Sequence, residues 1–121
     1  ETTVFFGPRW LSYPLTQDFW TNRDYFATTD LGLAPTAPWN ETHWSDAEWA
    51  KLYAEAKQTL DIAKRTELIQ ACQKIEWERS GYIIWGFANF VDAHSSKLAG
   101  LKPDVTLPLG HYGFGEAFLT S

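Results

Sequence analysis

Three aspartates in one aromatic-rich stretch are the residues best placed for acid–base chemistry. They are Asp18, Asp24 and Asp30. Two carboxylates that face each other across a cleft can act as acid and base on a glycosidic bond. Solvated loop carboxylates are much commoner than such pairs, so ordinary loop residues are the simpler interpretation. We predict that the chain is not an enzyme.

The histidines and the single cysteine indicate no metal chemistry. His43, His94 and His111 are widely separated, and none has the spacing of helical metal ligands. Cys72 stands alone, which excludes an internal disulfide and any multi-cysteine site. The eight glycines form no phosphate-binding loop before a helix. We therefore predict neither a metal ion nor a cofactor.

Aromatic side chains are the most unusual feature of the composition, with seven Trp, five Tyr and eight Phe. A Trp face can stack on a sugar, a peptide plane or a cation. Trp10, Trp20 and Trp39 fall in one loop-rich segment, where they could either line a ligand site or fill the core. Burial is the expectation for the three in regular elements, Trp49, Trp77 and Trp85.

The overall charge argues against nucleic acid as a partner. Ten Lys and Arg stand against fifteen Asp and Glu, a formal net charge of -5, and no basic run offers a local exception. No stretch approaches the roughly 20 apolar residues that a membrane-spanning helix needs. The partners that remain are small molecules and other proteins.

The first third of the chain combines an expected strand with a long irregular stretch. Residues 2–6 mix β-branched and aromatic side chains before Gly7-Pro8, which predicts a short strand. From Arg9 to about His43 no helical or strand period persists. A loop of this length usually surrounds a binding site or contains short helices, and we expect a helical turn around residues 16–27.

Two consecutive amphipathic helices are expected next. Ser45 and Glu48 fit a capping box, which predicts a helix from Asp46 to about Thr59. Asp61 fits the N-cap of a second helix, which Ser80-Gly81 would end. The short turn between them predicts antiparallel neighbours. The expected buried stripes are Trp49, Leu52, Tyr53 and Ala56 on the first helix and Leu68, Cys72 and Ile75 on the second.

The pattern becomes β-forming after the second helix. Residues 82–87 are densely apolar and aromatic, which predicts a buried strand, and residues 90–93 are a candidate for another. Glycine-bounded pieces at 98–101, 103–108 and 110–115 indicate a surface excursion. We expect it to end in a short element at 117–119.

Four short motifs follow one another between residues 39 and 103. They are Asn40 and Thr42 before the first helix, Asp61 to Arg65 opening the second, the strand Tyr82 to Trp85, and the turn Gly100-Leu101-Lys102-Pro103. In this order, and with the stretch Trp44–Leu52, they resemble the late portion of the family 5 extracellular solute-binding proteins. These are the dipeptide, oligopeptide and nickel-binding class.

The resemblance implies an α/β fold, specifically the C-terminal part of a two-lobed periplasmic-binding-protein-like (type II) fold with a helical hairpin followed by strands. Residues 1–84 would end ligand-binding lobe II, and residues 85–121 would form the hinge strand and the return segment to lobe I. The resemblance also implies a periplasmic or extracellular location, with or without a lipid anchor, and an ABC permease as membrane partner. We further expect a monomer.

The ligand class stays open at this stage. In peptide-binding relatives a Gly-Trp element lines the cleft, and an Asp three residues later pairs with the peptide's α-amine. Trp10 matches that Trp, but Arg9 precedes it and Tyr13 stands three residues on. A Tyr cannot supply the carboxylate that an ammonium group requires, so a neutral sugar suits the sequence as well as a peptide. The predicted ligand-binding residues are Trp10, Tyr13, Trp20 and Asn40.

The sequence therefore predicts the solute-binding component of an ABC importer, which captures an oligopeptide or oligosaccharide by closing a hinge. The alternatives are a fragment of a secreted carbohydrate-active enzyme and a free-standing aromatic interaction domain. A free-standing domain should close its own core within residues 1–121. A lobe fragment should leave the segment after the hinge strand without its packing partners.

Overall fold

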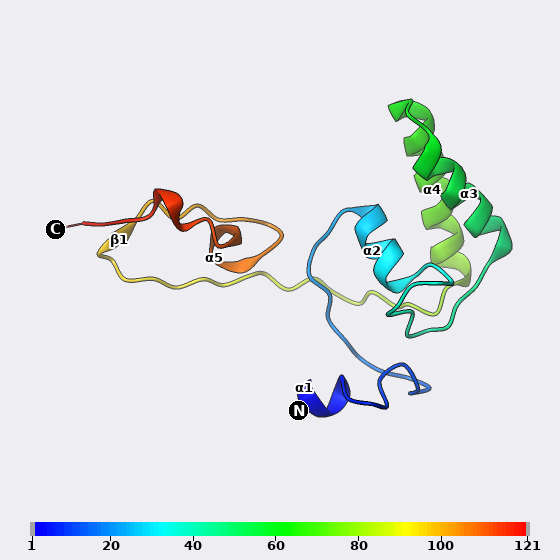
Figure 1. Cartoon of the computed structure of the whole chain (residues 1–121), viewed down its shortest axis with the longest axis horizontal. Helices are drawn as coiled ribbons and strands as arrows, with labels where there is room; N and C mark the ends of the chain where they lie inside the picture. Colours follow the sequence, from blue (N-terminus) through cyan, green and yellow to red (C-terminus); the bar gives the residue numbers. More distant parts are fainter. Residues whose placement is uncertain (1, 121) are drawn as a thin grey trace. The chain divides into compact units, whose positions relative to one another are not determined.

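The computed structural model describes residues 2–120, and the chain divides into two compact units (Figure 1). The first unit comprises residues 1–17 and 24–84, and the second comprises residues 18–23 and 85–121. The first unit contains the helices α1 Thr2–Phe5, α2 Tyr25–Gly32, α3 Ala47–Gln58 and α4 Ile62–Arg79. The second contains β1 Leu98–Ala99, α5 Pro108–His111, the 3-10 helix η1 Phe114–Glu116 and β2 Phe118–Leu119.

Helices α3 and α4 pack side by side as a hairpin and hold the core of the first unit (Figure 1). The indole of Trp49 is 1% exposed, and its ring stacks on Tyr53 at a centroid distance of 4.7 Å. Six residues of the two predicted stripes are buried, namely Trp49, Tyr53, Ala56, Leu68, Cys72 and Ile75. Leu52, which was expected to be buried with them, is only half-buried and packs against the core. Both helices are therefore confirmed, because each apolar stripe has the other to cover it.

The N-caps explain where the two helices begin. The prediction of Ser45 as the first cap is wrong by one residue, because the Asp46 carboxylate accepts the Trp49 N–H at 2.9 Å. Asp46 also receives an ion pair from Arg79 at 2.9 Å, which a serine could not form. Asp61 caps α4 as predicted, accepting the Lys64 N–H at 2.7 Å.

The N-terminal region differs from the predicted strand. The segment Thr2–Phe5 is a single helical turn. Among the described residues, no segment pairs with it as a strand. A strand there would leave its backbone hydrogen-bonding groups unpaired, which disfavours it. The predicted helical turn around residues 16–27 is replaced by α2, which begins later. Asp24 caps α2 by accepting the Ala27 N–H at 3.0 Å.

The chain leaves α4 in an extended conformation, and the predicted strands at 82–87 and 90–93 are wrong for this structure. Within residues 2–120, no backbone group of residues 83–94 takes part in a hydrogen bond. Trp85 is 77% exposed and Phe87 95% exposed, contrary to the expected burial. A strand needs neighbours, and the described residues supply none beside this segment.

Trp77 is a second correction to the expected burial. Its side chain lies on α4 and is 89% exposed. The buried stripe of that helix consists of Leu68, Cys72 and Ile75, which are three or four residues apart. Trp77 is two residues from Ile75 and therefore lies on a different side of the helix.

The second unit is organised by a two-stranded antiparallel sheet. Leu98 pairs with Leu119 and Ala99 with Phe118, which agrees with the pieces expected at 98–101 and 117–119. Gly100 adopts a φ of +86°, and a β-carbon there would collide with the Glu116 carbonyl oxygen. The sheet therefore depends on glycine at this position. None of the helices among residues 2–120 combines the length and apolar character that a bilayer crossing requires.

Candidate functional site

A small hollow in the first unit brings two of the predicted ligand-binding residues together. Its lining residues are Trp10, Leu11, Tyr13, Thr16 and Glu41, and it encloses about 10 Å³. The Trp10 indole N–H donates to Oε1 of Glu41 at 2.8 Å. The Thr16 hydroxyl donates to Oε2 of the same carboxylate at 3.4 Å. Aromatic side chains and a carboxylate thus line one hollow.

Two loops build this hollow, and strained backbone marks where they meet. Nε2 of His43 lies 2.7 Å from the Leu11 carbonyl oxygen, so the ring links residue 43 of one loop to residue 11 of the other. Leu11 has a φ of 67° and His43 a φ of 53°, both in the left-handed region that side chains other than Gly rarely adopt. Such strain persists only where the surrounding contacts impose it, and it clusters at binding sites.

Asn40 was predicted to contact a ligand, but in the structure its side chain bonds to its own loop. Its side chain is buried, and its amide nitrogen donates to the Trp44 carbonyl at 3.0 Å and the Ala34 carbonyl at 3.4 Å. Its side-chain oxygen accepts the Thr42 hydroxyl at 3.1 Å. Asn40 therefore fixes the turn that presents Glu41 to the hollow, and its own contact with a ligand stays a prediction.

Trp20 belongs to the second unit, whereas Trp10, Tyr13 and Asn40 belong to the first. The guanidinium of Arg23 lies 5.9 Å from the centroid of the Trp20 ring, within the range of a cation–π contact. The ring already contacts this internal cation, and its role in ligand binding stays a prediction.

Glu41 lines the hollow, and the sequence alone did not single it out. In the sequence it stands between Asn40 and Thr42. Its proximity to Trp10 joins residues 31 positions apart through the fold of two irregular loops. No periodicity or motif reports a contact of this kind, because neither loop has a regular spacing.

The three aspartates considered for acid–base chemistry each have an identifiable structural contact. Asp24 caps α2, and Asp18, in the second unit, accepts the Phe19 N–H at 2.6 Å. Asp30 pairs with the Lys57 ammonium at 2.7 Å and accepts the Tyr53 hydroxyl at 2.9 Å. The Lys57 hydrogen bond holds the pKa of the Asp30 carboxyl below its usual value.

A polar cluster beside the core joins α2, α3 and α4. Oε1 of Glu76 accepts the Trp49 indole N–H at 2.7 Å and the Tyr25 hydroxyl at 2.5 Å. Burial and the Glu76 hydrogen bond raise the pKa of Tyr25 far above its usual value, and burial raises the pKa of Cys72. The Tyr25 hydroxyl and the Cys72 thiol therefore stay neutral in ordinary buffers. Trp49 and Cys72 belong to the buried core, and Tyr25 packs against it.

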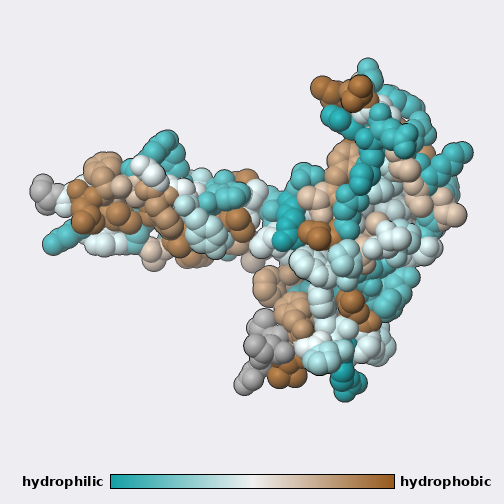
Figure 2. All heavy atoms as spheres, viewed as in Figure 1, coloured by the Kyte–Doolittle hydropathy of each residue, from teal (hydrophilic) through white to brown (hydrophobic). Residues whose placement is uncertain are grey.

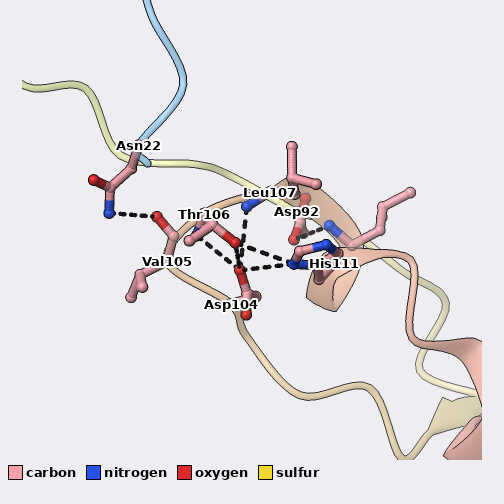
Figure 3. A network of polar contacts seen from close by, with 8 residues as sticks. Asn22, Asp92, Asp104, Val105, Thr106, Leu107 and His111 are labelled. Atoms are coloured by element: carbon pink, nitrogen blue, oxygen red, sulfur yellow. Dashed lines mark hydrogen bonds and ion pairs between the residues drawn. The ribbon is translucent and has the colours of Figure 1, made fainter. Parts of the chain in front are cut away.

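The second unit contains a polar network of its own around the loop at 104–111 (Figure 3). The Asp104 carboxylate accepts the hydroxyl and N–H of Thr106 and the Leu107 N–H, and it lies 3.7 Å from Nδ1 of His111. The Thr106 hydroxyl is the main cause that lowers the Asp104 pKa. Oδ2 of Asp92 accepts the Leu109 N–H at 2.7 Å. These contacts fix the path of the loop.

Known proteins give no family assignment for this chain. Comparison with protein-family models, with curated proteins and with solved structures finds no match. Among residues 2–120, no group of three or more His, Cys, Asp or Glu side chains is arranged to hold a metal ion. The hollow lined by Trp10, Tyr13 and Glu41 is the candidate binding site.

Proposed function

We propose that the chain is the C-terminal part of a solute-binding component of an ABC importer, with a two-lobed α/β fold of the type II class. It captures an oligopeptide or oligosaccharide outside the cytoplasm, in the periplasm or at the cell surface, and delivers it to a membrane permease. The receptor acts as a monomer, and closure of its lobes provides the function without catalytic residues.

The observation that carries this proposal is the segment that follows the helical hairpin. Tyr82 fixes its start by donating its hydroxyl to the Gly32 carbonyl at 3.0 Å. From residue 83 onward the backbone is extended, and it passes from the first compact unit into the second. A chain segment that links two bodies in this way is what the hinge of a two-lobed receptor requires.

The side chains of that segment favour a lobe fragment over a free-standing domain. In a strand, Ile83, Trp85, Phe87 and Val91 would alternate along one face, and Ile84 and Phe90 would lie on the other. All six are exposed, and Figure 2 shows hydrophobic surface on the second unit, to which most of them belong. An extended segment that is apolar on both faces is typical of a strand inside a covered sheet. A self-contained domain would have buried it.

The direct test is to identify what the protein carries. The full-length natural polypeptide that contains these residues is purified without denaturation, and mass spectrometry of the released fraction identifies its small molecules. We expect an oligopeptide or oligosaccharide. Trp10→Ala should retain at least tenfold less of it, because a ring that lines the hollow is lost. Trp77→Ala is the matched control, since that ring is exposed on α4.

Two results would contradict the proposal. One is a folded full-length protein that carries no small molecule and binds neither peptides nor oligosaccharides added at millimolar concentration. The other is cleavage of an added oligosaccharide, which would favour the secreted enzyme.

A further inference from the structure

We propose that His111 is a pH-responsive latch on the loop at 104–111 of the second unit, where its ring faces Thr106 and Asp104 (Figure 3). Protonation of the ring adds an ion pair with Asp104, which tightens a strained turn that holds the end of the extended segment. Loss of that proton loosens the turn. The response needs no ligand and therefore does not depend on the proposed function.

Four consecutive residues at the end of this loop have a left-handed backbone. The φ angles are 53° at Leu109, 60° at Gly110, 59° at His111 and 56° at Tyr112. Residues with a β-carbon visit this region singly rather than in runs, because the β-carbon lies too close to the following carbonyl oxygen. Three of the four carry a β-carbon, so the turn is strained and persists only while its contacts hold it. A small change in those contacts therefore shifts its population.

Two side chains hold this turn. Oδ2 of Asp92 accepts the N–H of Leu109, the first left-handed residue, at 2.7 Å. Oγ1 of Thr106 lies 3.1 Å from Nδ1 of His111, the third. Asp92 belongs to the stretch 83–94, whose backbone groups have no hydrogen-bond partners among residues 2–120. The bond from Leu109 to Asp92 therefore ties the end of that stretch to the turn.

Hydrogen-bond counting places a proton on Nδ1 of His111. The Thr106 hydroxyl has one hydrogen, and it is donated to the Asp104 carboxylate. The Thr106 oxygen can therefore only accept from the ring, so Nδ1 is the donor of the 3.1 Å contact. A second proton, on Nε2, makes the ring a cation whose Nδ1 lies 3.7 Å from Asp104.

Asp104 supplies a negative charge throughout the range in which an imidazole titrates. Its pKa lies below the ordinary 3.8, chiefly because its carboxylate accepts the Thr106 hydroxyl. An imidazole ordinarily gains its charge between about pH 8 and 5. Protonated His111 therefore stabilises the turn at the acidic end of this range, and that contribution is lost as the pH rises. The side chains of His111 and Asp104 are 61% and 34% exposed, so water screens the pair and the response is modest.

Other charged groups lie on the segments that contact the loop. They are Asp92, Asp18 and Arg23 on the segment whose Asn22 donates to the Val105 carbonyl, and the ion pair of Lys102 with Glu116 beside Gly110. Side chains of Asp, Glu, Lys and Arg ordinarily do not titrate between pH 5 and 8. His94 is the other imidazole of the second unit, and its Nδ1 lies 3.0 Å from the Ser95 carbonyl oxygen. It provides a matched control.

Amide hydrogen exchange of the 121-residue chain, followed in proton–nitrogen correlation spectra, tests the latch. The Leu109 amide is the reporter, because it is donated to Asp92 while the turn is formed. Protection is the ratio of the exchange rate of an unstructured peptide at the same pH to the observed rate. We expect the protection of Leu109 to be about two- to fivefold greater at pH 5 than at pH 8, the range that an exposed ion pair provides. Equal protection at the two pH values would overturn the proposal.

Three variants separate the latch from a general effect of pH. His111→Asn cannot titrate, and asparagine adopts a left-handed backbone readily. Asp104→Asn keeps an oxygen for the N–H groups of Thr106 and Leu107 but loses the charge. Both should protect Leu109 equally at pH 5 and pH 8, whereas His94→Gln should keep the full response. A response that survives in His111→Asn, or that disappears in His94→Gln, would contradict the assignment to His111.

The tautomer of His111 gives a separate measurement that does not depend on any variant of Asp104. Nitrogen-15 shifts of the imidazole rings at pH 8 distinguish a proton on Nδ1 from a proton on Nε2, and the His111 signals are those missing from His111→Asn. We expect the proton on Nδ1, where it is donated to Thr106. A neutral ring with its proton on Nε2 would remove that bond and with it the latch.

Discussion

Asp30 shows how a carboxylate on the surface ties one helix to another. It lies on α2, and Lys57 lies near the end of α3. The ion pair of 2.7 Å and the Tyr53 hydroxyl bond favour the ionised form of Asp30, so its pKa falls below 3.8 in the folded chain. About half of each side chain is exposed, and water therefore screens much of the attraction.

The direction of the resulting pH dependence follows from linkage. The lowered pKa means that ionised Asp30 stabilises the fold at pH values above 3.8, and this contribution is lost as the pH falls through the lower folded-state pKa. Asp30→Asn should therefore melt at a lower temperature than the unaltered chain at pH 6, and the difference should shrink as the pH falls through the lowered pKa of Asp30. Thermal unfolding followed by circular dichroism measures both. Glu55→Gln is the control, and a constant difference across this range would contradict the assignment.

At the scale of elements, the caps decide where each helix begins. Asp46 has two contacts, one with the Trp49 N–H and one with the Arg79 guanidinium. These can be separated by substitution, because asparagine keeps the capping oxygen and loses the charge.

Asp46→Ala should lower the free energy of unfolding by about 1 kcal/mol, since it leaves the Trp49 N–H without its partner. Asp46→Asn should cost less, and Ser45→Ala should cost almost nothing because Ser45 is not the cap. Urea denaturation of the three variants provides the comparison. If Ser45→Ala lowered the free energy of unfolding more than Asp46→Ala, Ser45 would be the N-cap and our assignment of Asp46 would be wrong.

The elements that the sequence predicted well are those whose stability is local. Helices α3 and α4 follow from apolar residues three and four apart, and their mutual burial requires only a short turn. The residues around 85 have an equally clear β pattern, yet a strand depends on neighbours that no local pattern supplies. The choice between Ser45 and Asp46 was also beyond the sequence, since both side chains cap helices well and Arg79 selects the second.

The candidate site was predictable in part for the same reason. Trp10 and Tyr13 share one short loop, so a resemblance confined to that loop could suggest both. Glu41 completes the hollow from a second loop, and Asn40 fixes that loop by bonds to the carbonyls of Ala34 and Trp44. Which irregular segments meet depends on the whole fold. The spacing of residues along the sequence therefore cannot predict that the two loops come together.

At the scale of the whole molecule, the chain forms two compact units and passes between them after residues 17, 23 and 84. The first unit has a helical core around Trp49, and the second has a short sheet in which Leu98 pairs with Leu119. The backbone groups of residues 83–94, most of which belong to the second unit, have no hydrogen-bond partners among residues 2–120. We propose that this segment belongs to a sheet whose other strands lie in the remainder of a two-lobed receptor.

Hydrogen exchange of residues 83–91 tests that assignment most directly, by comparing the 121-residue chain with the full-length natural polypeptide. In the shorter chain these amides should exchange at nearly the rate of an unstructured peptide, while the amides of α4 are protected. In the full-length protein we expect residues 83–91 to be protected by at least about a hundredfold, because neighbouring strands would accept hydrogen bonds from their N–H groups. Exchange of these amides at the unstructured rate in the folded full-length protein would contradict it.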